Sequence, residues 1–352
     1  MIKTVFVGLS GGVDSSVAAA RLKARGYNVV GVFIKVWHPD WLTCNWEQER
    51  LDAMRVAARL DIPFLTCDAE AAYRDAVAHE FIEGYKRGIT PNPDVLCNQH
   101  VKFGAFLEFA RAKGADYIAT GHYARTEKRA GRHALLRGVD TNKDQSYFLW
   151  TLTQEQLAST LLPVGDTTKD NIRREAEAAG LLTYDKKDSQ GICFLGHIDI
   201  PEFLSHYTEL IPGPVLNTSG EVIGEHTGAL VYTLGQRHGF TISTHSTIEQ
   251  PHYVVARDIS CNTITVDTTR PVLQTSEDIL LMQTNMITPS ETGEMIEAQI
   301  RYRQQPFLVK IIEQSTSTIT VRPVDTIERP AAGQSCVLYQ DEQCLGGGII
   351  TA

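Results

Sequence analysis

The sequence predicts an α/β protein with three parts: an N-terminal doubly wound parallel-sheet domain, a small central domain and a C-terminal β-barrel. From residue 3 to about 120, short β-branched runs alternate with longer segments of helical periodicity, as in βαβ units around a parallel sheet. The glycine- and serine-rich stretch "SGGVDSS" (residues 10–16) connects the first strand to the first helix. From about Pro212 onward the chain turns to short strands separated by glycine and asparagine turns, which is typical of small β modules and barrels.

The elements of the first part follow from their periodicity and end signals. A helix over "DSSVAAARLKARG" stops at Gly26, and a later one over "VKFGAFLEFARAKG" starts near Val101. A hairpin, "YARTEKRAGRHALLRG", precedes a helix at about 168–180 with Thr168 as its N-cap. We expect domains at 1–200, 201–272 and 273–352, with the 168–180 helix packing on the central domain. The remaining expected elements are strands at "KTVFVGL", "NVVGVFIKV", "PFLTCD" and "ADYIAT" and a helix over "NWEQERLDAMRVAARLDI".

Composition excludes several classes of protein. At 352 residues the chain suits two or three domains. No apolar run approaches the roughly 20 residues that span a bilayer, and the first strand begins close to Met1, so we expect a cytoplasmic protein that does not contact membranes. The seven cysteines are scattered singly, which does not fit a disulfide framework or a CxxC zinc site. Any cysteine chemistry should therefore be transient and catalytic.

The charge of the chain leaves its partners open. The formal net charge is −9, which argues against a uniformly positive surface but not against nucleic acid, because cations can cluster. The hairpin region holds such a cluster, which fits either a solvated hairpin with charged edges or a path for nucleic acid. Its members are Arg125, Lys128, Arg129, Arg132, Arg137 and Lys143.

The "SGGVDSS" stretch has the chemistry of a phosphate-binding loop. Gly11 and Gly12 let backbone N–H groups approach an anion, and the following helix adds its positive dipole end. The lysine of the GxxxxGK[ST] loop and the GxGxxG pattern are both absent. The segment resembles the pyrophosphate loop (PP-loop) of the ATP pyrophosphatases, which split ATP between its α and β phosphates. The resemblance implies adenylation of an oxygen, with Asp14 near Mg²⁺ and pyrophosphate.

Two separate cysteines are candidate nucleophiles. Cys97 would have a lowered pKa if it lay near the N-terminus of the helix expected from Val101, and Cys193 lies in a polar, glycine-containing loop. Taken alone, each cysteine is better explained as an inert, half-buried thiol. A zinc site with His100 and His122 lacks the short ligand spacing of such sites.

The order of motifs along the whole chain narrows these alternatives. The informative blocks are, in order, "GLSGGVDSSVAA", "FIKVW", "TPNPDVLCNQHVKFG", "ATGHYAR", "KDQSYFL", "DSQGICF", "YTLGQRHG", "RYRQ" and "CLGGGII". Through these blocks the chain is similar to the bacterial tRNA-specific 2-thiouridylases from Gly8 to Ile350. That family uses ATP to adenylate the 2-oxygen of the wobble uridine in glutamate, glutamine and lysine tRNAs. Sulfur from a cysteine persulfide then replaces the oxygen, which gives 2-thiouridine, AMP and pyrophosphate.

The resemblance implies roles for particular residues. Cys193 would receive a persulfide from a cysteine desulfurase or a sulfur-relay protein. Cys97 would release sulfide or resolve the intermediate, leaving a Cys97–Cys193 disulfide, and Asp94 would act as general acid or base. One chain supplies all of these parts, so we expect a monomer. The implied ATP-binding residues are Gly8, Leu9, Ser10, Gly11, Gly12, Val13, Asp14, Ser15, Ile34, which replaces a commoner methionine, and Gly121.

The resemblance also implies a tRNA-binding surface. Asn92, Pro93 and Asp94 would contact the target uridine, which must leave the base stack to be modified. Further contacts are implied at His122, Lys143, Asp144, Gln145, Arg301, Tyr302 and Gln334.

Two other functions compete with this interpretation. A PP-loop ligase or amidotransferase would adenylate a small-molecule carboxylate with the same loop, but would not need two reactive thiols. A non-catalytic, ATP-gated RNA-binding protein would form no AMP and pyrophosphate when tRNA is bound.

Overall fold

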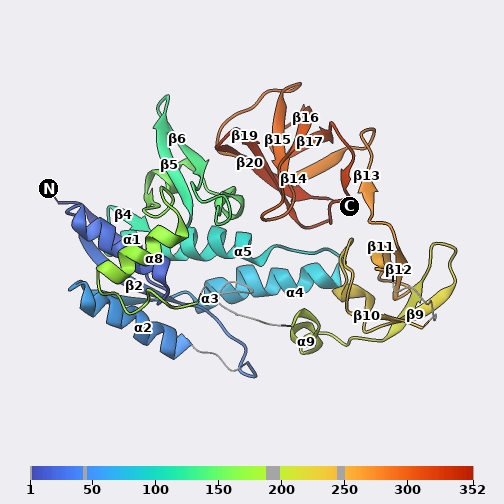
Figure 1. Cartoon of the computed structure of the whole chain (residues 1–352), viewed down its shortest axis with the longest axis horizontal. Helices are drawn as coiled ribbons and strands as arrows, with labels where there is room; N and C mark the ends of the chain where they lie inside the picture. Colours follow the sequence, from blue (N-terminus) through green and yellow to red (C-terminus); the bar gives the residue numbers. More distant parts are fainter. Residues whose placement is uncertain (1, 43–45, 188–198, 244–249, 352) are drawn as a thin grey trace.

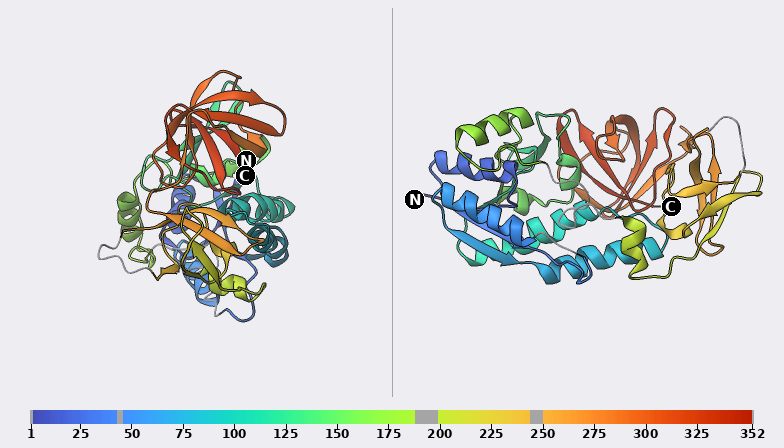
Figure 2. Two further views of the ribbon diagram at one scale, coloured as in Figure 1. Left: turned by 90° about the vertical axis from the view of Figure 1, so that its right-hand side faces the viewer. Right: turned by 60° about the horizontal axis from the view of Figure 1, so that its bottom comes forward.

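The computed structural model describes residues 2–42, 46–187, 199–243 and 250–351 (Figure 1). A parallel sheet with helices lies at one end of the molecule, a small β domain lies at the other, and a β-barrel lies beside the helices between them (Figures 1 and 2). Among these residues no helix is both long enough and apolar enough to cross a membrane. The three-part α/β architecture expected from the sequence is confirmed, while the boundaries near residues 200 and 272 stay predictions.

The N-terminal sheet is parallel and doubly wound. Its strand order is β3-β2-β1-β4-β7, so the chain leaves the central strand β1 first toward one edge and later toward the other. Two hydrophobic cores fill its two faces. The strands are β1 (Thr4–Gly8), β2 (Asn28–Lys35), β3 (Phe64–Asp68), β4 (Tyr117–Ala119) and β7 (Thr160–Leu161). The first four lie where the sequence predicted strands, and β7 was not predicted.

Three helices cover one face of the parallel sheet. They are α1 (Val13–Ala24), α2 (Trp46–Arg59) and α8 (Lys169–Ala178). Ile172 and Ala176 of α8 are fully buried in this core, so the expectation that α8 packs on the central domain is wrong. Thr168 is at the N-cap as predicted, but the Asp140 carboxylate, not the threonine side chain, accepts the first N–H of the helix.

The second face carries a helical run that the sequence analysis missed. It comprises α3 (Glu70–Tyr73), the π-helical η1 (Arg74–Ala78) and α4 (His79–Lys86). Tyr73 and Val77 pack on the N-terminal sheet, whereas Phe81 and Tyr85 enter the core of the central domain. One continuous helix thus joins the two domains.

A second helical run on this face holds the first candidate cysteine. It comprises α5 (Pro93–Leu96), the π-helical η2 (Cys97–Ala105) and α6 (Phe106–Ala112). The expected start near Val101 is wrong, because Asn92 caps the helix two turns earlier. Its Oδ1 accepts the N–H groups of Asp94 and Val95, and Pro93 occupies the first helical position.

The predicted hairpin leads into the barrel. It is formed by β5 (Ala124–Arg129) and β6 (Arg132–Arg137), and β6 pairs with the barrel strand β20. The 3-10 helix η3 (Ser146–Leu149) and α7 (Gln154–Ala158) follow. Trp150 Nε1 donates to Ser335 Oγ at 3.0 Å, and the Tyr147 hydroxyl donates to the Ser335 carbonyl at 3.0 Å.

The central domain and the C-terminal barrel consist mostly of antiparallel strands. The central sheet has the order β10-β9-β8-β12-β11, and β14–β20 pairing closes the barrel. The central elements are α9 (Ile200–Ser205), β8 (Gly213–Leu216), β9 (Val222–His226), η4 (Ala229–Val231), β10 (Phe240–Ile242), β11 (Tyr253–Asp258) and β12 (Thr263–Asp267). The barrel strands are β14 (Ile279–Met286), β15 (Met295–Gln299), β16 (Phe307–Gln314), β17 (Thr318–Pro323), β19 (Ser335–Gln340) and β20 (Gln343–Ile350), and β13 (Val272–Leu273) pairs with β18 (Ile327–Glu328) beside them.

Candidate nucleotide and sulfur-transfer site

The PP-loop lies at the topological switch point of the sheet. It follows the carboxyl end of β1, next to the loop after β4, which is where ligands bind in open α/β sheets. Gly11 has φ +70°, and a Cβ there would lie 2.7 Å from the Glu49 carbonyl oxygen, so only glycine fits. Gly12 is the N-cap of α1 and supplies no side-chain cap. The first N–H groups of α1 are therefore left for an anion.

Three serines brace the loop from within. The Ser10 N–H donates to Ser15 Oγ at 3.2 Å, and the hydroxyls of Ser15 and Ser16 donate to the Gly12 carbonyl at 3.3 and 2.7 Å. These bonds give the loop a fixed shape before any ligand arrives.

Gly121 lies against this loop, and Ile34 lies beside Gly8 at the end of the strand that precedes it. A Cβ on Gly121 would lie 2.7 Å from the Ser15 backbone nitrogen, so glycine allows the loop after β4 to touch the start of α1. Ile34 is 6% exposed, and its Cδ1 would be 3.5 Å from a Cβ on Gly8. Gly121 thus touches the PP-loop directly, and Ile34 touches the strand that leads into it.

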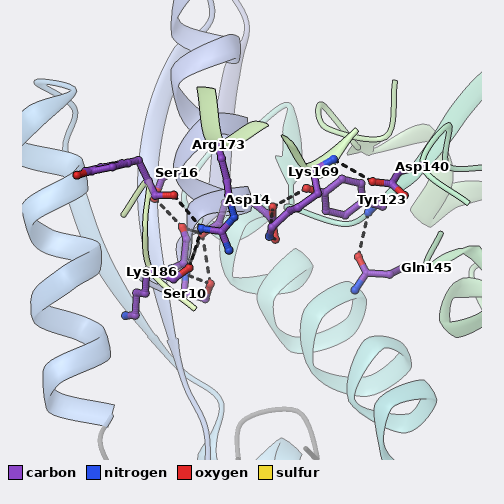
Figure 3. A network of polar contacts seen from close by, with 12 residues as sticks. Ser10, Asp14, Ser16, Tyr123, Asp140, Gln145, Lys169, Arg173 and Lys186 are labelled. Carbon is purple, nitrogen blue, oxygen red and sulfur yellow. Dashed lines mark hydrogen bonds and ion pairs between the residues drawn. The ribbon is translucent and has the colours of Figure 1, made fainter. Parts of the chain in front are cut away.

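Asp14 is bound by a lysine that the sequence analysis missed. Lys169 Nζ lies 2.8 Å from each Asp14 carboxylate oxygen, and the Tyr123 hydroxyl donates to Asp14 Oδ1 at 2.7 Å (Figure 3). Lys169 is 8% exposed and stands at the start of α8. The apolar periodicity around it predicted a helix but gave no sign that its first residue turns toward the PP-loop.

Two further cations, Lys186 and Arg173, hold residues 184–186 beside the PP-loop. Lys186 Nζ lies 2.7 Å from Asp52 Oδ2 and 3.0 Å from the Gly11 carbonyl oxygen, while Arg173 Nη1 donates to the carbonyls of Tyr184 and Lys186 (Figure 3). Burial would raise the pKa of Asp52, but the hydrogen bond and charge of Lys186 outweigh burial and leave that pKa lowered.

Cys97 is fully buried within its helix, and Asp94 is partly buried in the first turn of the same helix. Cys193 lies outside the described residues, so the structure does not place the two thiols relative to each other. Among the described residues, no group of three or more His, Cys, Asp or Glu side chains could hold a metal ion, so the zinc interpretation gains no support. Burial raises the thiol pKa to about 11 in Cys67 and to about 12 in Cys336 and Cys344, which disfavours these three thiols as nucleophiles.

The candidate tRNA contacts near the sheet have intramolecular partners. His122 is 7% exposed with Nδ1 2.8 Å from Thr120 Oγ1, and burial, with a smaller effect from the charge of Lys102, holds its pKa well below the ordinary value. Asp144 accepts the backbone N–H groups of Gly138 and Ser146. Gln145 Oε1 accepts the Tyr123 N–H, and burial raises the pKa of the Tyr302 phenol, which the charges of Arg303 and Lys143 partly offset.

The barrel candidates are tied to their surroundings in the same way. Arg301 Nη1 lies 2.7 Å from Glu328 Oε2, and the Tyr302 ring centroid lies 4.6 Å from that of Phe148. Gln334 Nε2 donates to the Thr90 carbonyl at 2.7 Å, two residues before Asn92. These contacts hold each of the three side chains in place within the protein.

The basic hairpin is largely neutralised where it meets the barrel. Arg125 and Arg129 both pair with Glu342, at 2.6 and 3.1 Å. Arg137 pairs with Asp144 and lies 3.6 Å from the centroid of the Tyr339 ring. For these three arginines the structure favours a role in joining hairpin and barrel.

These features define an α/β nucleotide-binding protein of the PP-loop class that carries two accessory β domains. Three family models match the chain in sequence: a tRNA methyl transferase HUP domain at 3–197, a tRNA methyl transferase PRC-barrel domain at 201–268 and an aminomethyltransferase beta-barrel domain at 276–350. The curated tRNA-specific 2-thiouridylases MnmA of Idiomarina loihiensis and Proteus mirabilis are 44% and 45% identical to it, each over 99% of this chain and over 96% and 97% of their own lengths. That of Listeria monocytogenes is 42% identical over 98% of this chain and 94% of its own. The chain belongs to the tRNA-specific 2-thiouridylase family, and it is therefore a tRNA-modifying enzyme.

Proposed function

We propose that the protein adenylates the 2-oxygen of the wobble uridine in glutamate, glutamine and lysine tRNAs and replaces that oxygen with sulfur from a cysteine persulfide. The products are 2-thiouridine, AMP and pyrophosphate. The observation that carries this proposal is the PP-loop at the switch point, with the first N–H groups of α1 uncapped, in a chain of the 2-thiouridylase family.

ATP fits the residues at the loop. The N–H groups at the start of α1 would hold phosphate oxygens, and Lys169 and Lys186 would offset the negative charge nearby. Asp14 is the acid that would hold Mg²⁺, and the ion would offset the charge of the phosphates and make pyrophosphate a better leaving group. Binding of Mg²⁺ there requires Asp14 to exchange at least part of its contact with Lys169.

The sulfur chemistry is assigned to two cysteines. Cys193 would carry the persulfide, supplied by a cysteine desulfurase or sulfur-relay protein, and Cys97 would release or resolve the sulfur, with Asp94 moving a proton. Because Cys97 is fully buried, neighbouring side chains must move before it can meet Cys193 or the base. Binding of the flipped-out uridine against residues 92–94 is a natural trigger, since these residues form the start of the same helix.

The tRNA would lie across the N-terminal domain and the barrel. Lys143 would add a positive charge and Tyr302 an aromatic ring to this surface, and Arg301 would add a guanidinium that turns from Glu328 to a phosphate. We expect a monomer, because one chain supplies every proposed part.

The nucleotide products test this proposal directly. With unmodified glutamate tRNA, ATP, Mg²⁺ and a persulfide source, we expect AMP and pyrophosphate, formed only when the tRNA carries a wobble uridine. The measurement is chromatography of labelled nucleotides, with a tRNA bearing cytidine at that position as the control. ADP and phosphate as products, or AMP formation independent of the tRNA, would contradict adenylation of the base.

A further inference from the structure

Residues 87–92 link α4, which ends in the core of the central domain, to α5 in the N-terminal domain (Figure 1). The Arg257 guanidinium of β11 donates to the carbonyl of Gly88 at the start of this link. Pro91 packs so closely on α4 that a Cβ on Gly84 would collide with the proline ring. The link is therefore held against both the central domain and α4.

Thr90, in the middle of the link, is hydrogen-bonded to both accessory β domains. Its hydroxyl oxygen lies 2.9 Å from the hydroxyl oxygen of Thr233 in the central domain. In the barrel, the Ala332 carbonyl accepts the Thr90 N–H at 2.9 Å, and Gln334 Nε2 donates to the Thr90 carbonyl at 2.7 Å. The three polar groups of one residue thus join the link to two other domains.

The Thr233 hydroxyl is itself held by a tight turn. The Thr233 carbonyl accepts the Gln236 N–H at 3.0 Å, and the Thr233 N–H donates to Gln236 Oε1 at 3.1 Å. Gly235 in this turn has φ +82°, and a Cβ there would lie 3.4 Å from Arg301 Nη2 of the barrel. The central domain and the barrel therefore meet close to Thr90.

Thr90 lies two residues before the N-cap of the candidate catalytic helix. Asn92 Oδ1 accepts the N–H groups of Asp94 and Val95 at 3.2 and 3.3 Å. Two residues span at most about 7 Å, so the position of Thr90 restricts the position of Asn92. A change at Thr90 therefore reaches the first turn of the helix that carries Cys97.

The hydroxyl is the part of this arrangement that depends on the residue type. Any residue other than proline would present the same N–H and carbonyl to the barrel, but only a side chain with a hydroxyl group in this place reaches Thr233 as Thr90 does. Valine has nearly the shape of threonine and lacks the hydroxyl, whereas serine keeps the hydroxyl. These two replacements therefore separate the hydrogen bond from the packing of the side chain.

We propose that Thr90 is a positioning residue: through its bond to Thr233, the central domain fixes the start of the helix that carries Asp94 and Cys97. The inference rests on the proposed function, because that proposal assigns these two residues to sulfur transfer. A tRNA held by the central domain and the barrel would act on the same link that leads to the helix cap. Binding of the substrate and placement of the reacting groups would thus be coupled through residues 90–92.

The first test is hydrogen–deuterium exchange at the Asp94 and Val95 amides of the free protein, resolved to single residues by mass spectrometry. We expect Thr90→Val to speed exchange at both amides about fivefold, the factor that corresponds to the loss of one ordinary hydrogen bond. Thr90→Ser should exchange like the wild type. Thr233→Val and the double variant should each match Thr90→Val, because all three remove the same bond.

The second test separates kcat from KM in tRNA-dependent AMP formation, with ATP, Mg²⁺ and a persulfide source. Thr90→Val should lower kcat about fivefold and leave the KM for glutamate tRNA within about twofold, and Thr90→Ser should restore kcat. The matched control is Thr318→Val, which removes a hydroxyl contact of 2.7 Å with Ser315 in a barrel turn. It should change neither the exchange of the two amides nor kcat.

Three results would overturn the inference: unchanged exchange at both amides in Thr90→Val, an equal change in Thr90→Ser, or faster exchange with an unchanged kcat. Thr90→Ala serves in place of Thr90→Val if the latter does not fold. Failure of the wild type to form AMP with tRNA would contradict the proposed function and leave the exchange comparison valid.

Discussion

The Asp14–Lys169 ion pair is the main side-chain contact of Asp14 beside the PP-loop. The carboxylate accepts two bonds from the lysine and one from Tyr123, and the lysine side chain is 10% exposed. Its pairing keeps a buried ammonium next to the phosphate-binding loop, where a cation is useful once the nucleotide arrives.

Lys169→Met should therefore lower both stability and nucleotide affinity. It leaves Asp14 partly buried without its cation, which we expect to cost about 2 kcal/mol, less than a fully buried pair because Asp14 is 29% exposed. For a domain of this size that corresponds to a thermal midpoint about 4 to 8 °C lower. Calorimetry of the variant checks this. The double variant Asp14→Asn/Lys169→Met should recover part of the loss, and equal midpoints for single and double variants would contradict a coupled pair.

At the scale of elements, the PP-loop depends on a glycine that is both strained and crowded. Gly11 combines φ +70° with a Cβ position 2.7 Å from the Glu49 carbonyl. Gly131, in the hairpin turn, has φ +81° but no atom within 4 Å of its Cβ position. A side chain at either position would strain the backbone, but only at Gly11 would it also collide with neighbouring atoms.

Gly11→Ala should displace the loop from α2 and weaken ATP binding by about tenfold or more, equivalent to about 1.4 kcal/mol or more. Gly131→Ala should carry the backbone cost of about 1 kcal/mol in stability while leaving ATP affinity unchanged. Isothermal titration calorimetry with ATP distinguishes them. Equal affinities for the two variants would show that the loop tolerates the extra atom and that its contact with α2 does not shape the site.

The elements also show how far sequence reasoning reaches. Alternating periodicities predicted four of the five strands of the sheet and the helices α1 and α2, and missed only the two-residue strand β7. The helix containing Cys97 begins earlier than the sequence analysis predicted. Asn92 is its N-cap and Pro93 its first residue, although both residue types are also common in loops. Lys169, Arg173 and Lys186 escaped notice because their partners lie more than a hundred residues away or in an irregular segment.

At the scale of the whole molecule, the C-terminal barrel is hydrogen-bonded to Thr90, just before the candidate residues 92–97 of the N-terminal domain. The Thr90 N–H donates to the Ala332 carbonyl at 2.9 Å, and the Thr90 carbonyl accepts from Gln334. A Cβ on Gly333 would lie 2.9 Å from the Thr90 nitrogen. No local pattern in the sequence could show this contact, since it depends on residues far apart in the chain.

Gln334→Ala should therefore loosen residues 90–94 even without tRNA. We expect faster hydrogen exchange at the Thr90 amide, because the bond to Ala332 loses its neighbour. Hydrogen–deuterium exchange of the free protein measures this, with Gln340→Ala as a control on an exposed barrel residue. Unchanged exchange at Thr90 together with weaker tRNA binding would instead assign Gln334 to the tRNA.

The central claim, that this chain thiolates tRNA through two cysteines, is tested most directly by the 2-thiouridine content of digested tRNA. Purified protein is incubated with unmodified glutamate tRNA, ATP, Mg²⁺ and a persulfide source, and nucleosides are analysed by mass spectrometry. We predict 2-thiouridine from the wild type and from Cys261→Ser, whose thiol is exposed but has no assigned role, and none from Cys97→Ser or Cys193→Ser. Thiolation by either of the last two variants, or ATP consumption by the wild type without sulfur in the tRNA, would contradict it.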